Sequence, residues 1–214
     1  RDCGNADFRT VTVDTTFAAA DGTAALAAAM DRILGEAEQA VRDGAAVVLL
    51  SDREAGTARV PVPALLAAAG LHHHLIRAGL RDMAGIFVES GEVREVMHLA
   101  LLTGYGVNAV NPYLAFETIA AHVADGTLPG MEMEDAVDHY ITALKKGLLK
   151  IFSKMGISTL RSYNSAQIFE AVGIQPAVVE KYFTGTASRI GGIGLDGIER
   201  EARDRKSTRL NSSH

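Results

Sequence analysis

The sequence predicts an α/β fold: a mainly parallel sheet flanked by helices, in a partial or barrel-like open arrangement. Short runs rich in β-branched residues alternate with longer amphipathic or alanine-rich segments, an order typical of strand–helix units in a parallel sheet. Some of the short runs, such as residues 46–50, are apolar throughout. Runs of that kind are expected where helices cover both faces of a sheet.

Local patterns assign each element. The first expected helix has apolar residues at helical spacing, with Asp21 or Thr23 as its cap and Gly44 at its end. Pro61 and Pro63 open the second, because proline is tolerated in a first helical turn. We expect strands at residues 11–13, 46–50, 85–88, 107–110 and 157–160, helices at 24–43, 61–78, 92–103, 112–124, 132–155, 165–172 and 176–183, and loops at 125–130 and 184–194.

The composition is that of an ordinary globular domain, with 48% hydrophobic and 22% charged residues among 214. The single cysteine, Cys3, cannot form an internal disulfide and, at the extreme start of the chain, says little about the compartment. Nothing indicates an oxidising compartment, so a cytoplasmic location is the default prediction. The apolar runs are too short to span a membrane. The chain is acidic, with a net charge of −5, which argues against a nucleic-acid partner.

Both ends of the sequence are unusual. The chain opens on Arg1 without the layout of a signal peptide, so we expect it to be truncated. Residues 204–214 resemble a translated sequencing adapter, and we expect an artefact there rather than a disordered basic tail. That tail carries a net charge of +2, which leaves −7 on the remaining residues.

Polar residues follow two of the expected strands. Ser51, Asp52 and Arg53 come directly after residues 46–50, where open α/β sheets bind ligands. A loop ion pair or a helix cap is the favoured interpretation of these residues. Residues 89–92 follow the next strand and could offer free N–H groups to an anion, but capping by Ser90 is favoured there.

Two further motifs invite a ligand. His72, His73 and His74 are consecutive, and helical neighbours point about 100° apart, so all three cannot bind one metal ion. Packing of one histidine, with polar partners for the others, is favoured. Residues 184–189 are rich in small polar residues and glycine but lack the spacing of known phosphate loops. A domain-connecting loop is favoured there over a phosphate site.

A stripe of lysines completes the candidate motifs. Lys146, Lys150 and Lys154 recur every four residues on one helix face, which is usually a solvated face and alternatively a docking surface for an acidic partner. No Ser–His–Asp or Cys–His arrangement has a local signature. The residues alone therefore predict an α/β segment without an evident active site.

Longer stretches resemble the central region of glutamate synthase large (alpha) subunits. The resemblance covers residues 11–202 and rests on residues 48–53, 62–67, 72–77, 88–95, 104–106, 111–117, 146–159, 162–163, 166–173 and 183–189. It implies an enzyme that makes two L-glutamate from L-glutamine and 2-oxoglutarate. In that family an amidotransferase domain releases ammonia, which travels through a tunnel, and an imine is reduced at FMN with electrons from NADPH, NADH or ferredoxin.

The resemblance also implies what this chain lacks. Cys3 does not match the glutamine-hydrolysing nucleophile, and a 3Fe–4S cluster needs three cysteines, whereas the chain has one. FMN and the cluster are thus expected in the parent enzyme and no cofactor in this fragment, which should be inactive alone. The implied partners are the amidotransferase and FMN domains of the same chain and a small NADPH-dependent subunit, with no nucleic acid and no membrane.

The implied role is that of a linking scaffold. We expect residues 1–160 to be the central domain, residues 161–203 to be the end of that domain or its connection toward the FMN barrel, and residues 204–214 to be the artefact. The residues expected to face neighbouring domains or the tunnel are Ser51, Asp52, Arg53, Ser153, Lys154, Ser158, Thr159, Thr184, Thr186 and Arg189. The alternative is a free-standing α/β domain that binds a small ligand or serves structural interactions.

Overall fold

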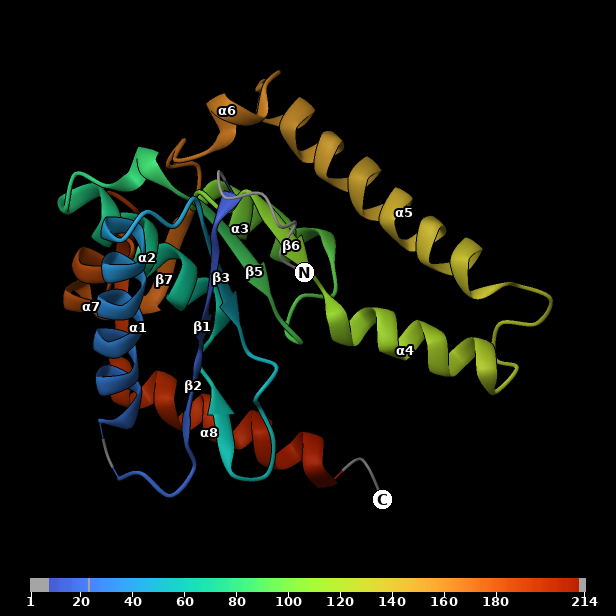
Figure 1. Ribbon diagram of the computed structural model, residues 1–214. Coiled ribbons are helices and arrows are strands. Elements are labelled where there is room, and N and C mark those ends of the chain that lie inside the picture. The colour runs from blue at the N-terminus through green and yellow to red at the C-terminus, as the bar shows by residue number, and fades with distance from the viewer. Residues whose placement is uncertain (1–7, 23, 212–214) are drawn as a thin grey trace.

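A four-stranded parallel sheet forms the centre of the protein (Figure 1). The computed structural model describes residues 8–22 and 24–211, with only the backbone of residues 206–211; Arg1, Cys3 and Thr23 lie outside these residues. The strand order is β1-β3-β5-β6, and Val13 lies opposite Leu50 across the first pair. The strands are β1 (Thr10–Asp14), β3 (Val47–Ser51), β5 (Gly85–Glu89) and β6 (Ala109–Asn111). The predicted α/β fold with a mainly parallel sheet is confirmed.

The two faces of this sheet differ in burial. Alternate residues of a strand point to opposite faces, and Val48, Leu50, Ile86 and Val88 on one face are at most 2% exposed. On the other face Leu49 is partly exposed and Phe87 is 36% exposed. The expectation that helices cover both faces is therefore met on one face only, and the second face is open in the described part of the chain.

Two helices cover the buried face. Helix α1 (Ala25–Arg42) packs against β1 and β3, and α2 (Ala64–Arg77) packs against α1 and β5. Leu26, Met30 and Ile33 of α1 are fully buried, as their helical spacing predicts. Gly44 follows α1 with φ +88°, which confirms it as the helix end.

The start of α1 differs from the prediction. Residue Ala24 occupies the cap position without a side-chain hydrogen bond, so Asp21 is not the cap. Instead Oε2 of Glu199, from the far end of the chain, accepts a hydrogen bond of 3.1 Å from the backbone N–H of Leu26. A carboxylate at this position accepts from an otherwise free N–H, and its negative charge interacts favourably with the positive end of the helix dipole.

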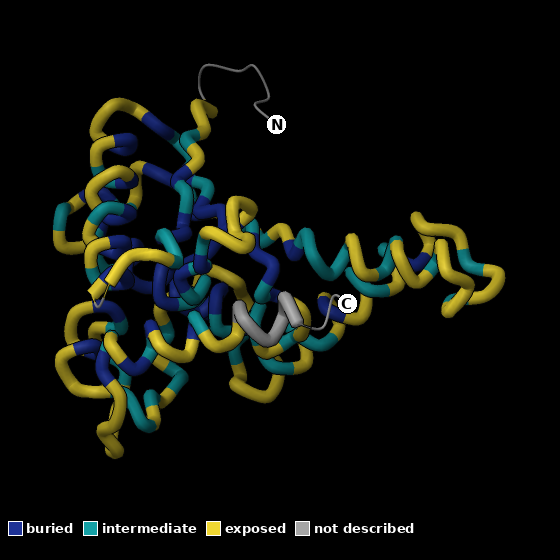
Figure 2. The backbone as a smooth tube through the Cα atoms, turned by 90° about the horizontal axis from the view of Figure 1, so that it is seen from below, coloured by how far each residue is buried: buried dark blue, intermediate teal, exposed yellow. Residues whose placement is uncertain are grey.

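A helical hairpin projects from the body (Figures 1 and 2). It consists of α4 (Tyr113–Ala124) and α5 (Met133–Lys154), and the predicted loop at residues 125–130 lies between them. None of the described residues of α4 is buried. Gly147 of α5 faces Val96 of α3 (Val96–Gly104), where a Cβ atom would collide with the valine side chain. Glycine thus permits a close approach of the two helices.

Three predictions in the last third are wrong. Residues 157–160 form no strand, because Thr159 caps the short helix α6 (Leu160–Tyr163). Residues 165–172 are not helical, and part of residues 184–194 is not a loop. These segments contain β7 (Glu170–Ile174) and β8 (Ala187–Ile193), which pair in parallel. Gly192 lies against the carbonyl oxygen of Gly173, where a side chain would not fit, so long-range pairing and not local pattern determines both strands.

The remaining elements complete the core and its rim. They are β2 (Thr16–Ala18), β4 (Arg59–Pro61), the 3-10 helix η2 (Arg81–Met83), α7 (Pro176–Tyr182) and α8 (Leu195–Asn211). Strands β2 and β4 pair antiparallel, so Pro61 ends a strand and α2 begins after Pro63. Helix α8 continues into the tail expected as an artefact. Within the described ranges, no helix is both long and apolar enough to cross a membrane.

Candidate functional site

The carboxyl ends of β3, β5 and β6 carry a connected polar cluster. Ser51 Oγ donates a 2.7 Å hydrogen bond to Oε2 of Glu89, and Arg53 Nε donates one of 2.8 Å to its Oε1. Asn111 Nδ2 donates to the same Oε1 at 3.1 Å. Burial alone would raise the pKa of Glu89, but the hydrogen bonds from Arg53 and Ser51 lower it below its usual value. Glu89 is therefore a fully engaged carboxylate.

Asp52 points the other way, into the protein. It is 3% exposed, and it accepts a 2.6 Å hydrogen bond from Ser90 Oγ and a 3.0 Å bond from the N–H of Gly91. The Arg53 guanidinium lies over the ring of Tyr113 at 4.3 Å. Burial, followed by the charge of Asp52, raises the pKa of the Tyr113 hydroxyl.

The strand-end cluster is thus a closed network of ion pairs and hydrogen bonds. Its two inner carboxylates, Glu89 and Asp52, each accept several hydrogen bonds from protein donors, which is the arrangement of a structural network. The favoured interpretation of Ser51–Arg53, an ion pair in a loop, is confirmed by the Arg53–Glu89 pair. Ser90 accepts a hydrogen bond from the N–H of Glu92, but α3 begins only at Val96, so Ser90 stabilises a turn and not the helix.

The three histidines point to three different environments. His72 is 5% exposed and accepts a 2.9 Å hydrogen bond at Nδ1 from Arg81 Nε. Because arginine is always a donor, His72 must carry its proton on Nε2, which lies 2.9 Å from Ser165 Oγ. Burial, then the charge of Arg81, lowers the pKa of His72 to about 4. His72 therefore cannot take a proton from Ser165, and the pair is no catalytic dyad.

The other two histidines, His73 and His74, have surroundings that differ from those of the His72–Ser165 pair. His74 Nε2 lies 2.6 Å from Oε2 of Glu38 on α1. In the part of the chain that the structure describes, His73 Nε2 is buried without a hydrogen-bond partner, and burial lowers the pKa of His73. Among the described residues, no group of three or more His, Cys, Asp or Glu side chains could hold a metal ion. The interpretation of one packed histidine and polar partners for the others agrees with this arrangement for His72 and His74, whereas Nε2 of His73 has no hydrogen-bond partner among the described residues.

A cavity of about 240 Å³ lies beside these histidines. Four separate segments line it: α2, the turn after α3, residues 165–169 and residues 184–186. Tyr105 and Phe169 stack with their ring centroids 6.1 Å apart, and the Tyr105 hydroxyl lies 2.7 Å from Thr186 Oγ1. Sequence patterns flagged His72, His73, Thr184 and Thr186 but missed Tyr105, Gln167 and Phe169, which have no local motif.

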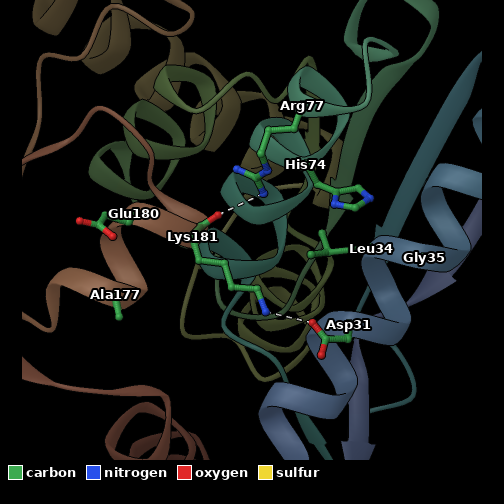
Figure 3. Close-up of a pocket in the computed structure, with 8 residues that line it drawn as sticks. All are labelled: Asp31, Leu34, Gly35, His74, Arg77, Ala177, Glu180 and Lys181. Atoms are coloured by element: carbon green, nitrogen blue, oxygen red, sulfur yellow. Dashed lines mark hydrogen bonds and ion pairs between the residues drawn. The ribbon is translucent and has the colours of Figure 1, made fainter.

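A wider groove of about 660 Å³ lies between α1, α2 and α7 (Figure 3). Lys181 reaches across it to Asp31 at 3.1 Å, and Arg77 donates to the backbone oxygen of Lys181 at 3.2 Å. The Glu180 side chain points away from Arg77 and Lys181. The Lys181–Asp31 ion pair lies on an open surface, and exposed pairs of this kind contribute little to stability.

The remaining candidate residues are dispersed on the surface. Ser153, Lys154 and Ser158 are exposed around the end of α5, as are Lys146 and Lys150 of the lysine stripe. Thr159 donates to Ser162 Oγ at 2.8 Å as part of its cap.

The candidates from the glycine-rich loop are likewise engaged or exposed. Thr184 donates to the backbone oxygen of Glu180 at 2.7 Å. The side chain of Arg189 on β8 is 85% exposed, with Glu170 at 3.5 Å. The ten predicted residues thus lie in three separate places and form no single site.

Comparisons with known proteins agree on one family. The family model of the glutamate synthase central domain matches residues 2–175. The glutamate synthase (NADPH) large chain of Bacillus subtilis (strain 168) is 49% identical over 170 residues, covering 79% of this chain and 11% of that relative. The glutamate synthase (NADH) of Schizosaccharomyces pombe is 44% identical over 197 residues, covering 92% and 9%.

Two further comparisons concern a ferredoxin-dependent relative and a solved structure. The ferredoxin-dependent glutamate synthase of Pyropia yezoensis is 40% identical over 203 residues, covering 89% of this chain and 13% of the relative. A mutant flavocytochrome b2 with benzoylformate matches with a TM-score of 0.48 and 17% identity, over 62% of this chain and 31% of that one, which is too low to compare sites. This chain spans only 9% to 13% of the length of these glutamate synthases. It belongs to the glutamate synthase central domain family.

Proposed function

We propose that this chain is the central linking segment of a glutamate synthase that makes two L-glutamate from L-glutamine and 2-oxoglutarate. Its task is to hold the amidotransferase and FMN domains of the same parent chain at a fixed separation. It also helps to enclose the path of ammonia between them. Keeping a reactive intermediate away from solvent is a recognised contribution to catalysis. The isolated segment is expected to be inactive.

The open face of the parallel sheet carries this proposal. Parallel sheets occur almost only with both faces covered, and in the described part of this chain one face leaves Phe87 36% exposed and Leu49 partly exposed. Ser51 and Glu89 lie two residues further along the same strands and so point to this face. A neighbouring domain that packs on the face would cover the apolar residues and meet the polar cluster at its edge.

The cofactors belong to the other parts of the proposed enzyme. A 3Fe–4S cluster held by three cysteines does not fit this chain, which has one. FMN is likewise assigned to the neighbouring barrel. The electron donor stays open among NADPH, NADH and ferredoxin, and an NADPH-dependent form would add the small subunit as a partner. We place the enzyme in the cytoplasm.

The test uses a full-length enzyme that contains this segment. In coupled turnover one glutamine is hydrolysed for each 2-oxoglutarate consumed. We expect Phe87→Asp to raise this ratio well above one, because a buried charge would loosen the domain packed on the sheet. Met133→Asp is the matched control: Met133 is 38% exposed but lies at the start of α5, away from the sheet. A Phe87→Asp enzyme with an unchanged ratio would refute the proposed packing.

The predicted interdomain residues receive a parallel test. Arg53→Ala, Lys154→Ala and Arg189→Ala sample the three places where these residues lie. Each change removes a partly or fully exposed cation, so a fall in coupling would indicate contact with a neighbouring domain. Unchanged stoichiometry in all three variants would remove these residues from the interface.

A further inference from the structure

The 240 Å³ cavity beside α2 combines an apolar wall with polar groups that converge on it. Phe169 and Tyr105 supply nearly parallel rings, with an angle of 21° between their planes. His73 of α2 supplies one polar group, and Ser165 and Gln167, from the same segment as Phe169, supply two more. Pockets that bind small molecules have this composition, a mainly apolar lining with a few placed polar groups.

The described residues that line the cavity carry no charge at neutral pH. Burial lowers the pKa of His72 to about 4 and lowers that of His73. Burial raises the pKa of the Tyr105 hydroxyl, and the other lining residues do not ionise. Arg77 contacts Thr184 at 3.4 Å, but its side chain lies in the neighbouring groove with Lys181 (Figure 3). An anion in the cavity would therefore lose hydration without a lining cation to compensate.

The hydrogen bonds around His72 determine which hydrogen the neighbouring Ser165 hydroxyl can donate. Arg81 occupies Nδ1 of His72, so Nε2–H of His72 donates to Ser165 Oγ. A hydroxyl that accepts in this way still has its own hydrogen to donate. Ser165 thus has a free O–H at the cavity, and it is ready for a carbonyl oxygen.

His73 supplies the second observation. Its Nε2 is buried and has no hydrogen-bond partner among the described residues, whereas buried polar atoms are nearly always satisfied. The nearby backbone is also unusual, since Ser165 and Gln167 adopt φ of 63° and 53°. Residues with a side chain rarely adopt such values, and those that do cluster at ligand sites.

We propose that this cavity binds a small, uncharged, planar molecule with a carboxamide-like edge, whose carbonyl accepts from Ser165 and whose other polar atom meets His73. The flat body of the ligand lies along the rings of Phe169 and Tyr105. The cavity is smaller than the range of about 300–1,000 Å³ that drug-sized ligands occupy, so the ligand is a single-ring compound. The site is separate from the open sheet face and does not depend on the function proposed above.

Two probes of equal size test the charge preference. Benzamide is neutral and carries a carboxamide, and benzoate has the same ring with a carboxylate. We expect calorimetric or NMR titration of the 214-residue chain to show benzamide binding at least tenfold tighter than benzoate. Equal affinity for the two probes, or no binding of benzamide, would overturn the proposal.

Variants then locate the site. His73→Phe should weaken benzamide binding about tenfold, while His74→Phe should change it less than twofold, because His74 faces Glu38 outside the cavity. Circular dichroism checks that each variant folds. Should His73→Phe fail to fold, Ser165→Ala removes the proposed donor and is expected to produce a similar loss. Unchanged affinity in the folded variant contradicts the assignment.

Discussion

Removing the carboxylate of Asp52 should be among the most damaging single changes in the protein. Asp52→Ala leaves the Ser90 hydroxyl and the Gly91 N–H without their acceptor, and Ser90 is only 1% exposed. Each buried group without a partner costs about 1–3 kcal/mol. We expect a loss of about 3 kcal/mol in the free energy of unfolding, which corresponds to a fall in Tm of about 6–12 °C for a chain of this size.

The assay is equilibrium urea unfolding followed by circular dichroism. Asp52→Asn keeps one acceptor oxygen and should lose only about 1 kcal/mol. Asp138→Ala is the control for removing an exposed carboxylate, since Asp138 is exposed on α5, and it should change stability by less than about 0.5 kcal/mol. Equal stability of the Asp52→Ala and Asp138→Ala variants would show that the strand-end network does not stabilise the fold.

Two further predictions concern pH and helix packing. Stability should fall as pH drops from 6.5 toward 4, because unfolded His72 protonates near 6.5 whereas the folded form stays neutral until about pH 4. The unfolded state binds more protons in that window, so protonation favours unfolding. Burial also lowers the pKa of His73, which adds to the same loss of stability. A Tm that stays constant from pH 7 to 4.5 would contradict this prediction. Gly147→Ala should lose about 1 kcal/mol, since collision with Val96 outweighs the gain of about 1 kcal/mol in helix propensity. The double variant Gly147→Ala/Val96→Ala should be more stable than Gly147→Ala alone.

Local sequence patterns predicted the parts of the fold whose causes are local. The first three strands of the sheet and the helices α1, α2 and α5 were placed to within about three residues, because hydrophobic periodicity and glycine at helix ends are properties of neighbouring residues. Strands β7 and β8 were missed. Their pairing depends on a contact between Gly173 and Gly192, and no window of neighbouring residues contains both.

The candidate site also has parts that local sequence predicts and parts that depend on long-range contacts. The polar residues after β3 and β5 were found because a strand end is visible in sequence, and their joining through Glu89 follows from parallel register. The cavity beside His73 could not be predicted, because its walls come from segments as far apart in the chain as His72 and Thr186. Ser165 and Gln167 have a left-handed backbone. Serine and glutamine rarely adopt this conformation, so their presence in the sequence does not indicate it.

The C-terminal helices belong to the same core as the sheet. Residues 176–203 lie beyond the family match at residues 2–175, yet Val178 and Tyr182 of α7 are buried in the core cluster. Arg203 of α8 donates to Glu199 and to the backbone oxygen of Ala19 at 2.7 Å.

A flexible linker would make few such contacts. The division at residue 160 stays a prediction, and within the described residues α7 and α8 pack against the same core as the sheet. A segment that fixes the distance between two domains needs this property, because only elements that share one rigid core transmit a position from one end to the other.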